Sequence, residues 1–172
     1  MFKGMKRGNL QMRIRDLALL SCVALGIAAC DTVPTTTDDS SMQAGQGLDS
    51  SGFPLGSQED LAVSAGDRVF FGFDRYDLMP EGSETAARQA AWLQKYPNVT
   101  ITISGYCDPR GTEEYNLGLG MRRANTLKSV LVDSGVDANR VATISYGKSI
   151  LLVEGSTEEA FAQDRASVIT LN

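Results

Sequence analysis

The segment spanning residues 99–134 constrains the fold of this chain more than any other. Apolar residues alternate with polar ones from Val99, which predicts a half-buried strand over 99–106. Asp108-Pro109-Arg110-Gly111 then suits a type I turn, and Thr112 is a candidate cap for the helix predicted over 115–134. A strand that leads directly into a helix is typical of an α/β fold. Ligand groups collect at the carboxyl end of such a strand, and Asp108 is predicted to lie there.

Similar patterns predict further elements on both sides of this segment. Strands are expected at 68–73, 99–106, 141–146 and 166–171, and helices at 80–96, 115–134 and 157–163. Pro80 suits the first turn of a helix, and Gly135 suits the position just after a helix end. The order βαβαβ-(α)-β predicts an α/β (α+β) two-layer sandwich. Both main helices should cover one face of a mixed four-stranded sheet, with right-handed crossovers.

Arg123 is the anomaly of the predicted helix 115–134. At about 100° per residue it projects between Val130 and Leu127, inside the apolar face, whereas Arg122 projects on the polar side. An arginine is rarely buried without a partner, because its guanidinium would lose its hydration for nothing. We therefore expect Arg123 to meet a carboxylate, supplied by the protein or by a ligand. Gly118 and Gly120 each weaken this helix by up to ~1 kcal/mol, which close packing would explain.

Residues 1–29 are predicted to form a secretory signal peptide. Five Lys and Arg residues precede a short apolar stretch that is too short to span a membrane. Ile27-Ala28-Ala29-Cys30 resembles the bacterial lipobox, in which the cysteine is acylated and becomes the new N-terminus. Cys30 is therefore the predicted lipidation site, and a stable membrane anchor. The alternative is an ordinary signal peptide that leaves Cys30 free.

Residues 30–60 are predicted to be the lipidated N-terminus and a flexible linker, because Ser, Thr, Gly and Asp dominate there. A folded domain is expected over 61–172. The mature part is acidic, since residues 30–172 carry 11 Lys and Arg against 20 Asp and Glu. This balance argues against a nucleic-acid partner and against attachment to anionic membranes by charge.

The cysteines predict no disulfide. Cys22 leaves with the signal peptide and Cys30 would be acylated, so Cys107 has no partner. The chain contains no histidine, so a nucleophilic Cys107 would lack the usual base. We expect Cys107 to be a small buried hydrophobic residue, and we expect neither a cofactor nor a metal.

Five short motifs in residues 67–172 carry a resemblance to a known family. They are Phe71-Gly72-Phe73-Asp74-Arg75-Tyr76-Asp77, Gly105 to Thr112, Glu114-Tyr115-Asn116, Arg122-Arg123-Ala124-Asn125 and Ser145-Tyr146-Gly147-Lys148. Their order and spacing resemble the peptidoglycan-binding signature of OmpA-like domains, most closely that of the peptidoglycan-associated lipoproteins.

The resemblance implies a non-enzymatic pocket for the diaminopimelate side chain of the peptidoglycan stem peptide. Asp108 would take the ammonium and Arg123 a carboxylate, with Asp74, Arg110 and Leu119 also lining the pocket. It further implies an outer-membrane lipoprotein that faces the periplasm and tethers the membrane to the cell wall. The Tol–Pal system of envelope maintenance and cell division would then supply its partners, TolB and other Tol proteins.

The chain departs from the family pattern in three places. Tyr106 stands where the family usually has histidine, Cys107 precedes Asp108, and Gln163-Asp164-Arg165-Ala166 replaces the usual Asn-Arg-Arg-Ala. The last departure puts an anion in place of a cation, which leaves any contact of the family there in doubt. Asp31, next to Cys30, also bears on membrane sorting, because aspartate there marks inner-membrane retention in enteric bacteria.

Two alternative functions remain open at this point. One is an OmpA-like lipoprotein that acts outside the Tol–Pal system. The other is a peptidoglycan hydrolase that uses Asp74 and Asp108 as a carboxylate pair. The hydrolase is disfavoured because a cationic ligand group would hold Asp108 ionised and spoil it as a general acid.

Overall fold

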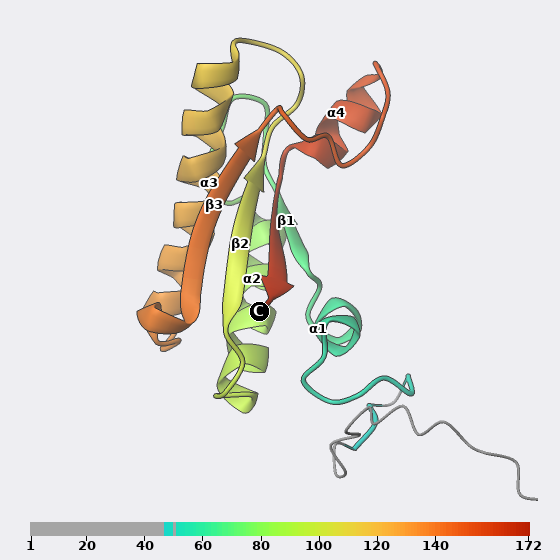
Figure 1. Ribbon diagram of the computed structural model, residues 1–172, viewed down its shortest axis with the longest axis vertical. Helices are drawn as coiled ribbons and strands as arrows, with labels where there is room; N and C mark the ends of the chain where they lie inside the picture. Colours follow the sequence, from blue (N-terminus) through green and yellow to red (C-terminus); the bar gives the residue numbers. More distant parts are fainter. Residues whose placement is uncertain (1–46, 50) are drawn as a thin grey trace, which may run out of the picture. The chain divides into compact units, whose positions relative to one another are not determined.

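The computed structural model describes residues 47–49 and 51–172 (Figure 1). The predicted signal peptide, Cys30 and most of the predicted linker lie outside the described residues. Within them, no helix is both long enough and apolar enough to cross a membrane.

Four strands form one mixed sheet in the order β1-β4-β2-β3. The elements along the chain are α1 (Gln58–Ser64), β1 (Arg68–Phe70), α2 (Pro80–Lys95), β2 (Ile101–Tyr106), α3 (Glu113–Asp133), η1 (Ala138–Arg140), β3 (Val141–Gly147), α4 (Glu158–Asp164) and β4 (Ala166–Leu171). Strand β4 runs antiparallel to β1 and β2, and β3 runs parallel to β2. The predicted mixed sheet is thereby confirmed.

Helices α2 and α3 cover the same face of this sheet, as Figure 1 shows. Their apolar sides and the inward residues of the strands enclose one core, whose fully buried members include Leu93, Leu127, Ile101, Ile103 and Ile169. The predicted two-layer sandwich with both main helices on one face is therefore confirmed.

The ends of α3 follow from its sequence. The Thr112 hydroxyl accepts a hydrogen bond from the Tyr115 N–H, as expected of a helix cap, and the helix starts two residues before the predicted Tyr115. At the other end Gly135 has φ 98°, the left-handed conformation that glycine adopts at low cost.

Helix α1 corrects the predicted linker, which reached residue 60. The Ser57 side chain accepts from the Asp60 N–H, and the buried Asp60 carboxylate accepts from Gly56 N (2.8 Å) and Ser64 Oγ (2.8 Å). Gln58 binds Ile169 O and Leu171 N, both at 3.0 Å, where β4 extends beyond the short strand β1. These polar bonds and the buried Leu61 together hold the segment, so its low apolar content was a poor guide.

Strand β1 also ends earlier than predicted, at Phe70 and not at residue 73. Phe71 N still donates to Arg165 O (2.8 Å), but Asp74 then adopts φ 56°, a left-handed conformation that aspartate tolerates better than most residues. The chain therefore turns away from the sheet here, and residues 72–75 become a loop next to the C-terminal end of β2.

Candidate functional site

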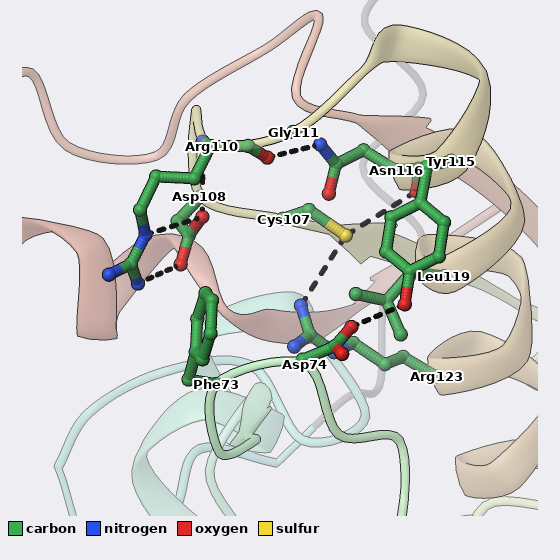
Figure 2. Close-up of a pocket in the computed structure, with 10 residues that line it drawn as sticks. All are labelled: Phe73, Asp74, Cys107, Asp108, Arg110, Gly111, Tyr115, Asn116, Leu119 and Arg123. Atoms are coloured by element: carbon green, nitrogen blue, oxygen red, sulfur yellow. Dashed lines mark hydrogen bonds and ion pairs between the residues drawn. The ribbon is translucent and has the colours of Figure 1, made fainter.

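A cavity of about 180 Å³ lies between the loop after β1, the end of β2 and the first half of α3 (Figure 2). This is smaller than the roughly 300–1,000 Å³ of pockets that enclose a drug-sized molecule, and it suits the end of one side chain. Its lining residues are Phe73, Asp74, Cys107, Asp108, Arg110, Gly111, Tyr115, Asn116, Leu119 and Arg123. The structure thus brings together all five residues that the family resemblance implies for a pocket.

Asp108 lies at the end of β2 with only 5% of its surface exposed. Its Oδ1 accepts from the backbone N–H and the Nε of Arg110, both at 3.2 Å, and its Oδ2 accepts from Arg110 Nη2 at 2.5 Å and from Arg165 Nη1 at 3.4 Å. Burial opposes ionisation of this carboxyl, but the bonds from Arg110 and Arg165 outweigh it and lower the pKa of Asp108. Asp108 is therefore an anion at neutral pH.

Glu158, on α4, joins these charges into a closed ring. It pairs with Arg165 at 2.8 Å and with Arg110 at 3.2 Å, so that two carboxylates and two guanidiniums alternate. Arg165 is the buried cation of the ring, and its Nε also donates to Phe71 O at 3.3 Å. The ring connects the loop after β2, the start of α4 and the residue before β4.

Arg123 is completely buried and is satisfied mainly by backbone carbonyls. Its guanidinium donates to Arg75 O and Tyr106 O, each at 2.8 Å, to Gly72 O at 3.1 Å and to Cys107 Sγ at 3.4 Å. The guanidinium also lies 5.3 Å from the centre of the Phe71 ring. The burial predicted from helical phase is correct, but within residues 47–49 and 51–172 no protein carboxylate pairs with Arg123.

One N–H group of the buried Arg123 guanidinium has no acceptor in the described part of the chain. A guanidinium carries five N–H groups, and the four bonds above use the Nε group, both Nη1 groups and one Nη2 group. The second Nη2 hydrogen has no acceptor among the described residues. Burial lowers the pKa of Arg123, with the nearby Arg165 adding to this effect, so an anion in the cavity would be favourable for it.

Cys107 is the buried residue that the sequence predicted. Its thiol donates to Asn116 O at 3.4 Å and accepts from Arg123, as Figure 2 shows. Burial raises the pKa of this thiol, and Asp108 reinforces the effect against the opposing charge of Arg123. Cys107 is therefore a neutral part of the cavity wall at neutral pH.

Asp74 and Phe73 form the exposed rim of the cavity. Asp74 Oδ1 accepts from the Tyr115 hydroxyl, so the loop after β1 is joined to the first turn of α3. Phe73 lies with its ring 4.2 Å from the Arg110 guanidinium carbon. Asp74 therefore holds the loop against α3, and Phe73 supports Arg110.

A side-chain bond stabilises the loop at 108–111, where the sequence predicts a type I turn. The Asp108 side chain accepts from the Arg110 N–H, as in an Asx turn, and Gly111 adopts φ 84°. Asn116 Nδ2 then donates to Arg110 O (2.7 Å), and Lys148 Nζ donates to Gly111 O (2.6 Å). Side chains from α3 and from the loop after β3 thus fix the loop that carries Asp108.

A direct backbone contact sets the distance between β2 and α3. A Cβ atom at Gly120 would lie 2.4 Å from Ser145 Oγ and 2.9 Å from Gly105 O, so only glycine fits. The close packing expected for Gly120 is confirmed, whereas a Cβ atom at Gly118 would meet only Arg122 Nη1 at 3.6 Å. Gly118 therefore has no packing requirement in this structure.

Glu158 and Arg165 lie next to Asp108 beside the cavity, although no sequence pattern predicted them there. Arg165 belongs to the departure at 163–166, which left contacts there in doubt, yet it pairs with Asp108. Asp164 is the residue that turns away, and its Oδ1 accepts from Leu152 N (2.7 Å) and Val153 N (3.0 Å). The acid therefore holds the loop before α4 and does not face Asp108. The usable signal was Arg165 itself, an arginine directly before an apolar strand.

The comparisons with known proteins agree on one family. The OmpA family profile matches residues 70–165. The peptidoglycan-associated lipoprotein of Rhizobium meliloti is 40% identical over 164 residues, which cover 95% of this chain and 92% of that protein. The protein of the same name from Agrobacterium fabrum is 39% identical and covers 94% of this chain and 91% of its own length.

Two solved structures show the same fold. The peptidoglycan-associated lipoprotein of Burkholderia pseudomallei is 32% identical with a TM-score of 0.60, covering 62% of this chain and 90% of that chain. The C-terminal domain of Helicobacter pylori MotB is 22% identical with a TM-score of 0.58, covering 62% and 84%. The second likeness is one of fold alone.

Proposed function

The chain belongs to the OmpA family, in the group of peptidoglycan-associated lipoproteins, and from this we propose that it binds peptidoglycan without cleaving it. The ligand we propose for the cavity is the side chain of diaminopimelate in the stem peptide. Asp108, Arg123, Asp74, Arg110 and Leu119 would form its binding site.

The observation that carries this proposal is the pair of opposite buried charges in one small cavity. Asp108 is a buried anion, and Arg123 is a buried cation with one donor to spare. The free end of diaminopimelate presents an ammonium and a carboxylate on the same carbon, so an anion and a cation can hold both groups. Leu119, which is 4% exposed, would contact the aliphatic part of the side chain.

A hydrolase fits this site less well. Asp108 has a lowered pKa and bonds to two arginines, so it does not hold the proton that a general acid must donate. Asp74 is bonded to the Tyr115 hydroxyl on the rim and supports the loop. Incubation of the purified protein with intact peptidoglycan separates the two functions, because a hydrolase releases soluble fragments and a binding protein sediments without release.

The rest of the chain suits a tether between membrane and cell wall. Acylated Cys30 would anchor the protein in the outer membrane on the periplasmic side. Residues 31–57, which are rich in Ser, Thr and Gly, would connect this anchor to the folded domain. The Tol–Pal system would be its functional setting, and co-purification of TolB from detergent-solubilised envelopes tests this part of the proposal.

The decisive experiment measures binding of the soluble mature chain, residues 31–172, to two stem peptides. One peptide contains diaminopimelate, and the other contains lysine, which lacks the second carboxylate. We expect the diaminopimelate peptide to bind more tightly, and Asp108→Asn to weaken its binding by roughly 2–5 kcal/mol. Equal affinity for both peptides, or wild-type affinity in Asp108→Asn, would contradict the proposal.

A further inference from the structure

The acceptor positions of Asp108 are already filled by the protein itself. A carboxylate offers about four lone-pair positions. Arg110 takes three of them through its backbone N–H, Nε and Nη2, and Arg165 takes the fourth through Nη1. A ligand ammonium that binds Asp108 must therefore displace one of these donors.

Arg110 is the donor that can leave. Its side chain is 39% exposed, whereas that of Arg165 is 10% exposed and is also held by Phe71 O. Arg110 Nη1 already bonds to Glu158, and its guanidinium carbon lies 4.2 Å from the Phe73 ring and 4.9 Å from the Phe161 ring. A guanidinium released from Asp108 would keep this anion and both aromatic faces.

We propose that Arg110 is an internal competitor for Asp108, which the ammonium of the ligand must displace onto Glu158. The identity of that ligand rests on the proposed function. Arg110 would then set specificity, because a neutral group at this position of the ligand cannot replace a guanidinium on a buried carboxylate. Such a ligand would leave Asp108 and Arg110 paired and gain nothing from the site.

Glu158 acts in this exchange as a positioning residue for the two arginines. It attracts Arg110 away from Asp108, and it also holds Arg165, which would otherwise bond more closely to Asp108. Removal of its charge should leave both arginines with Asp108 as their remaining partner in the ring. The ammonium would then meet stronger competition.

Three single variants of the soluble mature chain test this exchange. Arg110→Gln removes the competitor, and Glu158→Gln removes the anion that receives it. Glu159→Gln is the matched control, since it makes the same charge change one residue further along α4, and Glu159 has no ion pair within the described part of the chain. The probes are the diaminopimelate stem peptide and the same peptide with the side-chain amine acetylated.

Arg110→Gln and Glu158→Gln should change the affinity for the ligand in opposite directions. For the free-amine peptide, we expect Arg110→Gln to bind about fivefold more tightly and Glu158→Gln about two- to fivefold more weakly, the range of one partly exposed ion pair. Glu159→Gln should match the wild type, and the acetylated peptide should bind all four proteins with equal, low affinity. Carboxyl NMR of the unliganded Arg110→Gln chain should show the pKa of Asp108 rising.

Each contrary result overturns a different claim. If Arg110→Gln binds the free-amine peptide with unchanged or lower affinity, Arg110 is not a competitor and the inference is wrong. If Glu159→Gln weakens binding as much as Glu158→Gln, the loss of affinity comes from the change in net charge. Glu158 is then not the residue that receives Arg110. If the wild-type chain binds neither peptide, the proposed function fails, and this inference fails with it.

Discussion

A Cβ atom at Gly105 would lie 1.9 Å from the carbonyl oxygen of Gly120, so strand β2 and helix α3 meet backbone to backbone. Gly105 comes three residues before Asp108, and Gly120 comes three residues before Arg123. The contact therefore sets the separation of the two residues that are central to the proposed site. The contact is made by backbone atoms alone, because glycine stands on both elements.

Gly120→Ala should destabilise the domain, whereas Gly118→Ala should not. The new methyl group at Gly120 would overlap Ser145 Oγ and Gly105 O, and overpacking of this kind costs roughly 1–3 kcal/mol. At Gly118 the methyl group has room, and alanine should stabilise the helix by up to ~1 kcal/mol. Urea unfolding of the two variants gives the comparison. A Gly120→Ala variant with the stability of the wild type would contradict the close contact between β2 and α3.

Arg123→Lys should cost far more stability than Arg122→Ala. A lysine cannot reproduce the three carbonyl bonds of the guanidinium fork, and the loss should lower the free energy of unfolding by roughly 2–4 kcal/mol. Arg122 is exposed near the Tyr76 and Tyr115 rings, so its replacement should stay within about 0.5 kcal/mol. The urea midpoints of the two variants measure this difference. Similar midpoints would contradict the assignment of Arg123 to the buried face of α3.

The stability of the domain should fall in acid partly through Asp108. Because the pKa of Asp108 is lowered in the folded state, its contribution is present above the ordinary aspartate pKa of ~3.9 and is lost as the pH falls through the folded value. Unfolding free energies at pH 6 and pH 3 should therefore differ less in Asp108→Asn than in the wild type.

Some acid dependence should remain in the Asp108→Asn variant. Burial opposes ionisation of Asp60, but the bonds from Gly56 N–H and the Ser64 hydroxyl outweigh it and lower its pKa as well. If the free energy of unfolding falls by the same amount between pH 6 and pH 3 in the wild type and in Asp108→Asn, the Asp108 carboxylate is not held by its two arginines.

The Cys107 thiol should resist alkylation in the folded protein. Burial raises its pKa and also blocks access, so iodoacetamide at pH 7.5 should label it only at the rate of unfolding. Cys107 is the only cysteine in residues 31–172, so mass spectrometry of the soluble mature chain reports on it directly. Rapid labelling without urea would show that the cavity wall opens to solvent.

Cys30→Ser should release the protein from membranes while the domain still binds its ligand. We propose acylated Cys30 as the sole anchor, since the mature chain is acidic and unsuited to anionic membranes. Fractionation after a high-salt wash measures the change, and a variant that still sediments with membranes would contradict the lipid anchor. Density separation of the two membranes in the wild type tests whether Asp31 alters sorting.

The elements of this fold could be predicted where a periodic apolar pattern met a clear start or stop. Helix α2 begins at Pro80 as predicted, and β4 spans Ala166–Leu171 as predicted. Helix α1 could not be predicted in this way, because Gln58 bonds to β4, more than a hundred residues later. A contact between polar side chains and distant backbone leaves no periodic pattern in the sequence.

The residues that line the cavity were predicted mainly from the family resemblance, whereas their hydrogen-bond and ion-pair partners were not predicted. Helical phase found Arg123 inside the apolar face, yet its partners are carbonyls of an irregular loop and a strand end, which no residue type encodes. Glu158 reaches the ring only because of where α4 lies in the folded chain. Such relations depend on three-dimensional placement, and short-range pattern does not contain them.

The carbonyl bonds of Arg123 have a consequence for how the domain opens. They join α3 to the loop after β1 at Gly72 and Arg75 and to the end of β2 at Tyr106. Opening of this segment on its own should be costly, because it would break all three carbonyl bonds of the buried guanidinium at once. The walls of the cavity and the hydrophobic core should therefore belong to one cooperative unit, whose amide protons exchange only when the whole domain unfolds. In the proposed tether, mechanical load on the bound cell wall would then not open the cavity one wall at a time.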